Sequence, residues 1–278
     1  MKIKYLGTAA AEGVPALFCR CPVCEKSRSA GGRNIRSRSQ AIIDDTLLID
    51  YPPDSFMHFI NDNIDLISIS TCILTHCHSD HLYPEDFEMR KPGFAHFGKG
   101  RDINKLTVYA SEASAQPIFD AIERYNIGSD VLGVKTVRPF EPFEVEGYTV
   151  TPLKADHDRS TDPLFYSVEK DGKALLYAND TGYFPQETWD YLEKTKPVFD
   201  FVSLDCTGCI VNYRQGHMGL EADSDVKARM LDSGLANENT VFCCHHFSHN
   251  GLVTYDEFVP LAEEKGFLVS YDSMEYEF

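Results

Sequence analysis

The sequence of 278 residues has no apolar run long enough to cross a membrane, and no internal repeat, low-complexity segment or obvious linker. A spanning helix needs about 20 consecutive apolar residues, so a membrane span is not indicated. The N-terminal "MKIKYLG" is typical of a strand start. It is not typical of a signal peptide, because no apolar h-region follows it. We expect a protein of the cytoplasm, with a single large layered domain over 1–278.

Positive charge is scarce. The chain has 26 Lys and Arg against 43 Asp and Glu, which gives a formal net charge of −17. A surface this acidic repels the phosphates of nucleic acids. It is compatible with a small anionic substrate, because bound divalent metals can dominate the local field. We therefore expect no nucleic acid and no membrane as a partner, and we leave a homodimer open.

The cysteines do not form an even set: there are nine, several of them clustered or inside apolar runs. This pattern favours a reducing compartment, with thiols and metal ligands, over a disulfide scaffold. In "FCRCPVC", residues 18–24, Cys19, Cys21 and Cys24 follow the spacing C-x-C-x₂-C. A closed structural zinc site needs four ligands, so the fourth must come from elsewhere in the chain.

Apolar patterning and turn residues predict strands and helices in both halves of the chain. Strands are expected at 2–6, 41–50 (two strands about a turn at Asp44 and Asp45), 72–76, 106–110, 148–157, 164–180 (a pair) and 199–205, with another beginning at 266. Helices are expected at 52–63, 111–127, 185–195, 220–233 and 254–265, with a further helix start at 83–90. Strands followed by helices in each half predict an α/β fold, in which two sheets pack face to face with helices outside.

The segment "THCHSDH", residues 75–81, is the strongest functional pattern. It follows an apolar run, so it begins where a strand ends. In extended backbone alternate residues project to one side, which brings His76 and His78 together. If a helix then begins, Asp80 and His81 turn toward a neighbouring point. The segment can therefore supply two metals, which in hydrolytic sites typically lie about 3.5–4 Å apart.

This motif resembles the H-x-H-x-D-H signature of the metallo-β-lactamase-fold superfamily, which implies a metallo-β-lactamase-like αββα four-layer sandwich. In that family a histidine, a bridging aspartate and a last histidine follow in chain order. His157, Asp180 and either His245 or His246 stand at these positions. The resemblance implies two catalytic divalent metals, zinc or manganese, with the ligands His76, His78, His157 and Asp180 for one and Asp80, His81, Asp180 and His246 for the other.

The same loop offers a fourth ligand for the cysteines. His249 lies three residues beyond His246, so it can face a different metal on the other side of the loop. It would complete a Cys₃His structural zinc site, in which a knuckle at 19–24 is closed by the 246–249 loop. This favours His246 over His245 without excluding a shift by one residue. The two motifs together resemble the PhnP-type phosphodiesterases, over residues 1–250, which implies a cyclic phosphate as the substrate.

Three further features surround these motifs. His217 lies in "RQGHMG", and related phosphodiesterase and tRNA-processing branches carry a histidine in a similar context, read as a general acid or as a stabiliser of the transition state. A departing alkoxide needs such a proton donor. Arg33, Arg36 and Arg38 could grip a phosphate, but a solvated basic loop explains them equally well, so we leave them out of the site. The glycine-rich segment 91–103 is a candidate substrate lid.

We expect a metal-dependent phosphoric diester hydrolase acting on a small anionic phosphodiester. A hydroxide bridging the two metals would attack phosphorus, with Asp80 and His217 as catalytic residues. Because a fold does not determine a substrate, three alternatives stay open: a lactonase or thioesterase, an RNA 3′-end-processing nuclease, and an inactive metal-dependent binding or sensor protein. The net charge of −17 counts against the nuclease, and the intact ligand set counts against the inactive protein.

Overall fold

The structure is a computed structural model that describes residues 1–96 and 104–278. Residues 97–103 of the candidate lid therefore lie outside the described residues. In the described part of the chain, no helix combines the length and the apolar character needed to cross a membrane.

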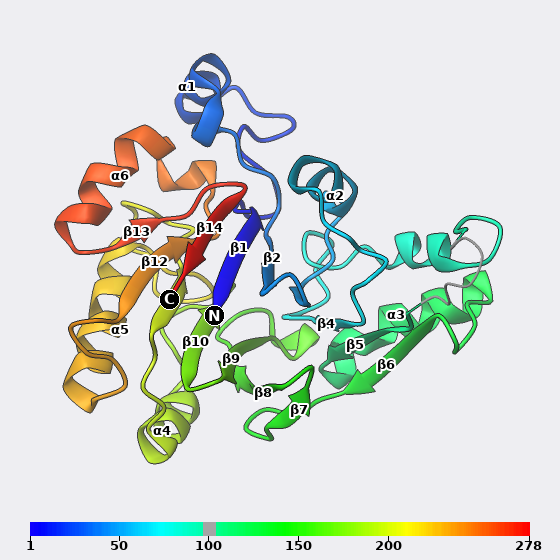
Figure 1. Ribbon diagram of the computed structural model, residues 1–278. Helices are drawn as coiled ribbons and strands as arrows, with labels where there is room; N and C mark the ends of the chain where they lie inside the picture. Colours follow the sequence, from blue (N-terminus) through cyan, green and yellow to red (C-terminus); the bar gives the residue numbers. More distant parts are fainter. Residues whose placement is uncertain (97–103) are drawn as a thin grey trace.

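The described residues form two mixed sheets of seven strands each (Figure 1). The first sheet has the order β14 (Met274–Glu277), β1 (Lys2–Gly7), β2 (Gln40–Ile43), β3 (Leu47–Ile49), β4 (Thr71–Ile73), β5 (Leu106–Ala110) and β6 (Leu132–Thr136). The second has the order β13 (Leu268–Val269), β12 (Val241–His245), β11 (Phe201–Asp205), β10 (Lys173–Ala178), β9 (Leu164–Lys170), β8 (Tyr148–Lys154) and β7 (Phe143–Val145).

The described part of the chain has six α-helices, most of which lie on the outer faces of the two sheets (Figure 1). They are α1 (Pro22–Ala30), α2 (Ser55–Asp62), α3 (Glu112–Tyr125), α4 (Gln186–Thr195), α5 (Leu220–Ser233) and α6 (Tyr255–Glu264). Ile118 of α3 packs in a core with strands of the first sheet. Trp189 of α4, Val226 of α5 and Phe258 of α6 pack in another core with strands of the second sheet. The predicted αββα sandwich is confirmed.

Strand β10 shows why these residues form a central layer. Leu175 and Tyr177 point into the core between the two sheets, whereas Leu176 and Ala178 point into the core under the helices. Successive side chains of a strand project to opposite faces, so a strand covered on both faces is apolar throughout. After Lys173, the run "ALLYA" meets this requirement.

Most of the predicted elements are present, but strands β6 and β7 were not predicted and two other segments differ. Residues 83–90 form a 3₁₀ segment, Pro84–Arg90, where we expected the start of a helix. Helix α1 was not predicted, although Pro22 occupies its first turn, where proline is well tolerated because its missing N–H would be unpaired in any case. The turn at Asp44 and Asp45 is as expected, with φ of 48° and 55°, the left-handed pair typical of a two-residue hairpin.

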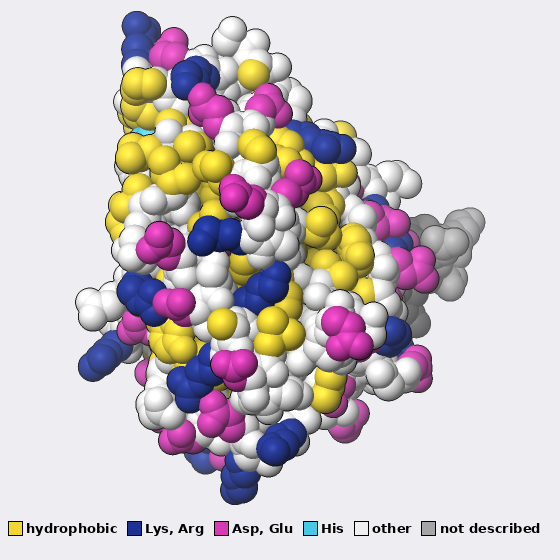
Figure 2. All heavy atoms as spheres, turned by 90° about the vertical axis from the view of Figure 1, so that its left-hand side faces the viewer, with side chains coloured by type: hydrophobic (Ala, Val, Ile, Leu, Met, Phe, Trp, Pro, Cys, Tyr) yellow, Lys and Arg dark blue, Asp and Glu magenta, His cyan; other side chains and the backbone are white. Residues whose placement is uncertain are grey.

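Charges are mixed on the helical side of the second sheet. Figure 2 shows this face, on the left-hand side of Figure 1, where acidic and basic side chains are interspersed among apolar ones. Leu231 of α5 and Leu261 of α6 are among the exposed apolar side chains. The part of this face that the structure describes therefore presents no broad area of a single charge sign.

The two sheets are joined directly beside the 75–81 loop. The hydroxyl of Tyr166, on β9, donates a buried hydrogen bond of 2.7 Å to the carbonyl oxygen of Leu74, which follows β4. The N–H of Leu164 donates to the carbonyl oxygen of Thr75 at 2.9 Å. The second sheet thus holds the end of β4 from which His76 extends.

We predict that Tyr166→Phe lowers the free energy of unfolding by about 1–3 kcal/mol, because the buried Leu74 carbonyl loses its donor. Urea denaturation of the metal-loaded protein measures this difference. Tyr276→Phe is the matched control, since its hydroxyl makes no hydrogen bond to the described residues, and it should stay within about 0.5 kcal/mol. Equal stability of Tyr166→Phe and the control would contradict the prediction.

Candidate metal centre

The 75–81 loop turns its side chains to two neighbouring points, as the sequence predicts, but it does so through a turn and not a helix. The N–H groups of His81 and Leu82 both donate to the carbonyl oxygen of His78, at 2.9 Å. Before this turn, His76 Nε2 lies 2.9 Å from His78 Nδ1. After it, Asp80 and His81 lie against a different group of side chains.

The first group consists of His76, His78 and His157, whose nearest ring nitrogens all lie within 4.8 Å of one another. His157 follows β8, and its Nε2 lies 3.2 Å from His78 Nδ1. Burial lowers the pKa of His76 well below its usual value and also lowers the pKa of His157. Both rings are therefore favoured in the neutral form that binds metals.

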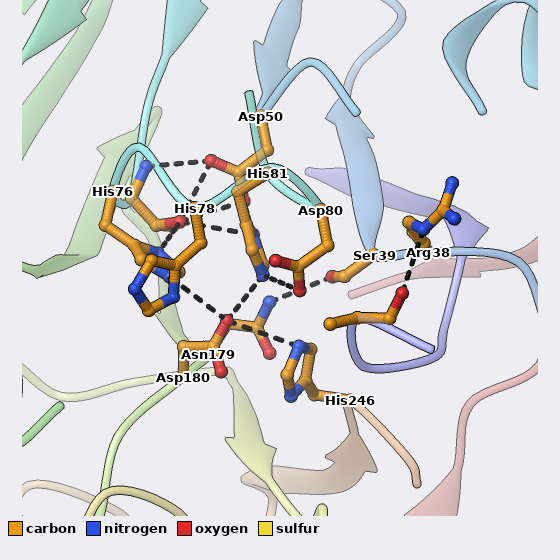
Figure 3. Close-up of polar contacts among 12 residues, drawn as sticks. Arg38, Ser39, Asp50, His76, His78, Asp80, His81, Asn179, Asp180 and His246 are labelled. Carbon is orange, nitrogen blue, oxygen red and sulfur yellow. Dashed lines mark hydrogen bonds and ion pairs between the residues drawn. The ribbon is translucent and has the colours of Figure 1, made fainter. Parts of the chain in front are cut away.

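The second group consists of Asp80, His81, Asp180 and His246, all buried. Asp180 follows β10 and lies between the two groups (Figure 3). Its Oδ2 is 2.5 Å from His81 Nε2 and 3.2 Å from His246 Nε2. The same oxygen is 3.8 Å from His76 Nε2 in the first group.

The backbone is unusual where the strands end. Asp50, Asp180 and His246 have φ of 65°, 49° and 62°. This left-handed conformation is uncommon for residues other than glycine and tends to occur at functional sites. It redirects the chain at the end of a strand. Figure 3 shows the side chains of Asp180 and His246 directed toward the same point.

Each histidine of the two groups uses one ring nitrogen to bind a neighbour outside them. The bonds are His81 Nδ1 to Asp50 Oδ2 (2.7 Å), His246 Nδ1 to Thr207 Oγ1 (2.9 Å), His157 Nδ1 to the Gly216 carbonyl oxygen (2.9 Å), His78 Nε2 to Asp158 Oδ2 (3.1 Å) and His76 Nδ1 to Thr75 Oγ1 (3.2 Å). Such contacts fix the tautomer and orientation of metal-binding histidines. The second ring nitrogen of every histidine is thereby left to face the other members of its group.

Three inward-facing atoms of the second group lack hydrogen-bond partners. His81 Nε2, His246 Nε2 and Asp180 Oδ2 are all buried without one among the described residues. Buried polar atoms are nearly always paired, so their convergence needs an explanation. Imidazole nitrogens and carboxylate oxygens are ligands for divalent metals such as zinc, and divalent metals therefore fit this cluster of atoms.

His245 and His246 have different surroundings, although they are adjacent. His245 Nε2 lies 2.9 Å from Ser39 Oγ, and its Nδ1 lies 3.0 Å from Ser270 Oγ. Its ring lies against that of Tyr5, with the centroids 4.6 Å apart. The structure therefore brings His246 into the second group and leaves His245 in a hydrogen-bonded pocket beside the core.

His217 lies beside the second group, with 30% of its side chain exposed. Its Nδ1 lies 2.9 Å from Asp205 Oδ2 and 3.4 Å from Asp180 Oδ1. Burial alone would lower the pKa of His217, but the charge and hydrogen bond of Asp205 outweigh it and raise the pKa to about 9. Nδ1 donates to Asp205, and Nε2 is the ring nitrogen left for another partner.

The cysteines meet their fourth partner as predicted. Cys19, Cys21, Cys24 and His249 place their ligand atoms within 4.8 Å of one another, and His249 Nδ1 is 3.5 Å from Cys19 Sγ and 3.3 Å from Cys21 Sγ. Burial raises the pKa of Cys24 to about 12. It also opposes ionisation of Cys21, but hydrogen bonds from the Cys24 N–H and from His249 lower that pKa to about 6.

Three acidic residues position these side chains, and none of them was predicted to be a site residue. Asp50 binds His81, Asp205 binds His217, and Glu12 Oε1 lies 3.4 Å from His249 Nε2, behind the cysteine cluster. Asp50 and Asp205 both end or follow apolar runs, as Asp180 does, and this position at the end of a strand is the signal that could have identified them. Glu12 lies in a loop, and no pattern in the sequence links it to His249.

The three arginines beside the cysteines bind other parts of the protein. Arg36 is buried, and its Nη1 donates to Thr8 Oγ1 at 2.8 Å and to the Ser270 carbonyl oxygen at 2.7 Å. The Arg33 guanidinium lies 3.9 Å from the centre of the Tyr271 ring. Arg38 Nε donates to the carbonyl oxygen of Ala11 at 2.9 Å. These contacts explain the residues without a phosphate ligand.

Two solved structures share the fold of this chain, and one curated protein matches part of its sequence. Zn²⁺-bound PqqB from Methylobacterium extorquens matches with a TM-score of 0.76, 20% identity and full coverage of both chains. A diphosphatase of the PhnP family matches with a TM-score of 0.74 and 19% identity, over 100% of this chain and 97% of the other. An octanoyltransferase of Porphyromonas gingivalis is 33% identical over 168 residues, which are 57% of this chain. The chain spans about a third of that protein's length, since the match covers 31% of it.

The family model for the beta-lactamase superfamily domain matches residues 46–233, more than half of the chain. That range contains all of the first histidine group and all of the second group except His246. The observed αββα sandwich agrees with this match. The chain therefore belongs to the metallo-β-lactamase superfamily and has the fold of that superfamily.

Proposed function

We propose that the protein is a phosphodiesterase with two catalytic divalent metals, which hydrolyses small phosphodiesters. The observation that carries this proposal is the pair of ligand groups that meet at Asp180 beside His217. The proposed ligands are His76, His78, His157 and Asp180 for one metal, and Asp80, His81, Asp180 and His246 for the other. Metals bound there would activate water and neutralise charge that develops on the phosphoryl oxygens.

His217 is the proposed general acid. With Nδ1 held by Asp205, a protonated His217 can donate the proton on Nε2 to a departing oxygen. The raised pKa of His217 favours the protonated form near neutral pH. Asp205 also fixes the direction of the ring, which keeps Nε2 available to the substrate.

We further propose that Cys19, Cys21, Cys24 and His249 hold a structural zinc. Cys24 Sγ accepts a hydrogen bond of 3.3 Å from the Ala16 N–H, and Cys19 Sγ accepts one of 3.3 Å from the Cys21 N–H. These donors suit sulfur atoms that carry negative charge. Reduced thiols are required, and all nine cysteines are free, which supports a reducing compartment such as the cytoplasm.

A phosphodiester is preferred over other substrates for two reasons. The cysteine knuckle and the H-x-H-x-D-H motif resemble the PhnP-type branch, and a diphosphatase of the PhnP family shares the fold. His217 also supplies the proton that an alkoxide leaving group needs, whereas the thiolate of a thioester departs without one.

The partial match to an octanoyltransferase favours a second candidate, which is hydrolysis of an acyl ester or thioester. Assays of phosphodiesters, lactones and thioesters on enzyme of known metal content separate the two candidates. Turnover of thioesters or lactones without turnover of any phosphodiester would replace the proposal.

We predict that the protein contains close to three metals per chain, falling toward one after mild chelation, as measured by elemental analysis.

Cys24→Ser should lose the retained metal and lower the melting temperature, because binding of a structural metal contributes to folding. Asp80→Ala should lose activity with a smaller effect on melting. Cys243→Ala, which removes a buried thiol outside these groups, should keep all three metals. A wild-type protein that holds one metal at most would contradict the binuclear proposal.

We also predict that Asp50→Asn weakens metal binding at the second group about 10–100-fold, as is typical when the partner of a ligating histidine is lost. Asparagine keeps an oxygen for the Thr75 N–H (2.8 Å from Asp50 Oδ1) but removes the charge opposite His81 Nδ1. Competition with a chelator of known affinity measures the change. Asp45→Asn, in the exposed turn before β3, is the control. If both variants hold metal like the wild type, Asp50 has no such role.

A third prediction concerns His217. A general acid matters most when the leaving group is poor, so His217→Ala should slow an alkyl phosphodiester by about 10²–10⁴-fold. A nitrophenyl phosphodiester should slow far less, because nitrophenolate departs without a proton. Steady-state kcat values for the two substrates give this comparison. Equal losses would reject the acid role and indicate that His217 stabilises charge on the phosphoryl group.

A further inference from the structure

A groove of about 1030 Å³ lies beside the first histidine group. Its walls include Asp156 and Arg159, on either side of His157, and Gln215, next to the Gly216 that binds the His157 ring. Tyr183, three residues beyond Asp180, also lines it. The groove is thus built on the same loops that carry His157, Asp180 and His217.

The lining of the groove combines apolar and charged side chains. Val137, Pro139, Pro163, Leu164 and Pro185 give it an apolar part. The basic side chains are Arg138, Lys154, Arg159 and Arg214, and the acidic ones are Glu112, Asp156, Asp162 and Glu187. The groove therefore has as many basic as acidic side chains. Because the chain as a whole has a net charge of −17, positive charge is locally enriched in the groove.

Two of the four cations already have partners. Lys154 Nζ lies 2.9 Å from Glu187, and Arg214 Nη1 lies 2.7 Å from Asp225. Arg138 and Arg159 are exposed. Among the described residues, neither has a carboxylate within ion-pair distance or a side-chain hydrogen bond. These two guanidinium groups are the ones in the groove that can bind an anion without first breaking an ion pair.

The position of His217 indicates which part of a substrate lies there. A general acid stands next to the leaving oxygen, and Arg214 and Gln215, just before His217 in the chain, line the groove. In the hydrolysis a P–O bond forms to the water oxygen and the P–O bond to the alcohol breaks. The alcohol oxygen keeps the bonding pair and takes the proton from His217. The groove is therefore the space next to the departing alcohol.

We propose that the groove receives the leaving alcohol of the diester, and that this alcohol carries a second anionic group bound by Arg138 and Arg159. The apolar lining then contacts the organic body between the two anions. This inference rests on the proposed phosphodiesterase activity. It narrows the substrate class from any small phosphodiester to one with a bulky, acidic alcohol component.

The test uses pairs of aryl methyl phosphodiesters whose phenol bears either an ω-carboxyalkyl chain or the matching carboxamide, with one to three methylenes. The two phenols of a pair have similar leaving ability, so a difference in KM reports recognition of the charge.

In the wild type, the KM of the best acid should be about tenfold lower than the KM of its amide, which corresponds to about 1.4 kcal/mol. Arg159→Gln and Arg138→Gln should each raise KM for the acid far more than KM for the amide, so that the difference between acid and amide shrinks. Arg124→Gln, an exposed arginine of α3 outside the groove, should behave as the wild type.

Calorimetric binding of the free phenols to the metal-loaded protein separates this inference from the proposed activity. If no phosphodiester is hydrolysed, the proposed activity fails, but tighter binding of the acidic phenol that is lost in the Arg138→Gln, Arg159→Gln double variant would still support the groove as an anion site. Equal KM and equal binding for acid and amide at every chain length would overturn the inference. An acid preference that survives in the double variant would overturn it as well, since other groups would then bind the charge.

Discussion

The carboxylate of Asp180 is the point on which the rest of the centre depends. One of its oxygens lies within 4 Å of ring nitrogens from His76, His81 and His246. These residues follow strands of two different sheets, so the contact exists only if the sheets pack in one relative position. The apolar core between the sheets sets that position, and the hydrogen bond from Tyr166 to Leu74 restrains it where His76 extends. Packing far from the polar atoms thus decides whether the two groups meet.

The outer hydrogen bonds of the histidines have a similar function at shorter range. Asp50 and Thr207 each hold one ring nitrogen, and the Gly216 carbonyl holds another. A histidine that is free to rotate would lose side-chain entropy on binding a metal. Here the side-chain entropy is lost during folding, because the protein orients the rings before any ligand binds. The same principle applies to His217, whose orientation depends on Asp205.

The sequence was most informative where functional residues are close together in the chain. Residues 75–81 revealed a two-metal pattern because alternation along a strand and a following turn are local properties. His157 and Asp180 required the resemblance to a family, since nothing local links them to that loop. Asp50 and Glu12 escaped prediction because their partners, His81 and His249, are brought close only by the tertiary fold.

The choice between His245 and His246 depended on a left-handed backbone angle at His246, which spacing alone cannot give. The 3₁₀ form of 84–90 and the presence of α1 were likewise set by local geometry that the apolar pattern does not encode.

The cysteine cluster also has a consequence for the order of events during synthesis. Cys19 and His249 are 230 residues apart in the chain. At a translation rate of ~5–20 residues per second, the histidine emerges roughly 10–50 s after the cysteines. During this interval the nascent chain exposes three thiols that have no fourth partner, beside an N-terminal strand, β1, whose neighbour β14 is also not yet made. Both of these contacts join segments that are far apart in the sequence, so the residues around β1 and Cys19 complete their native surroundings only after His249 and β14 have been made.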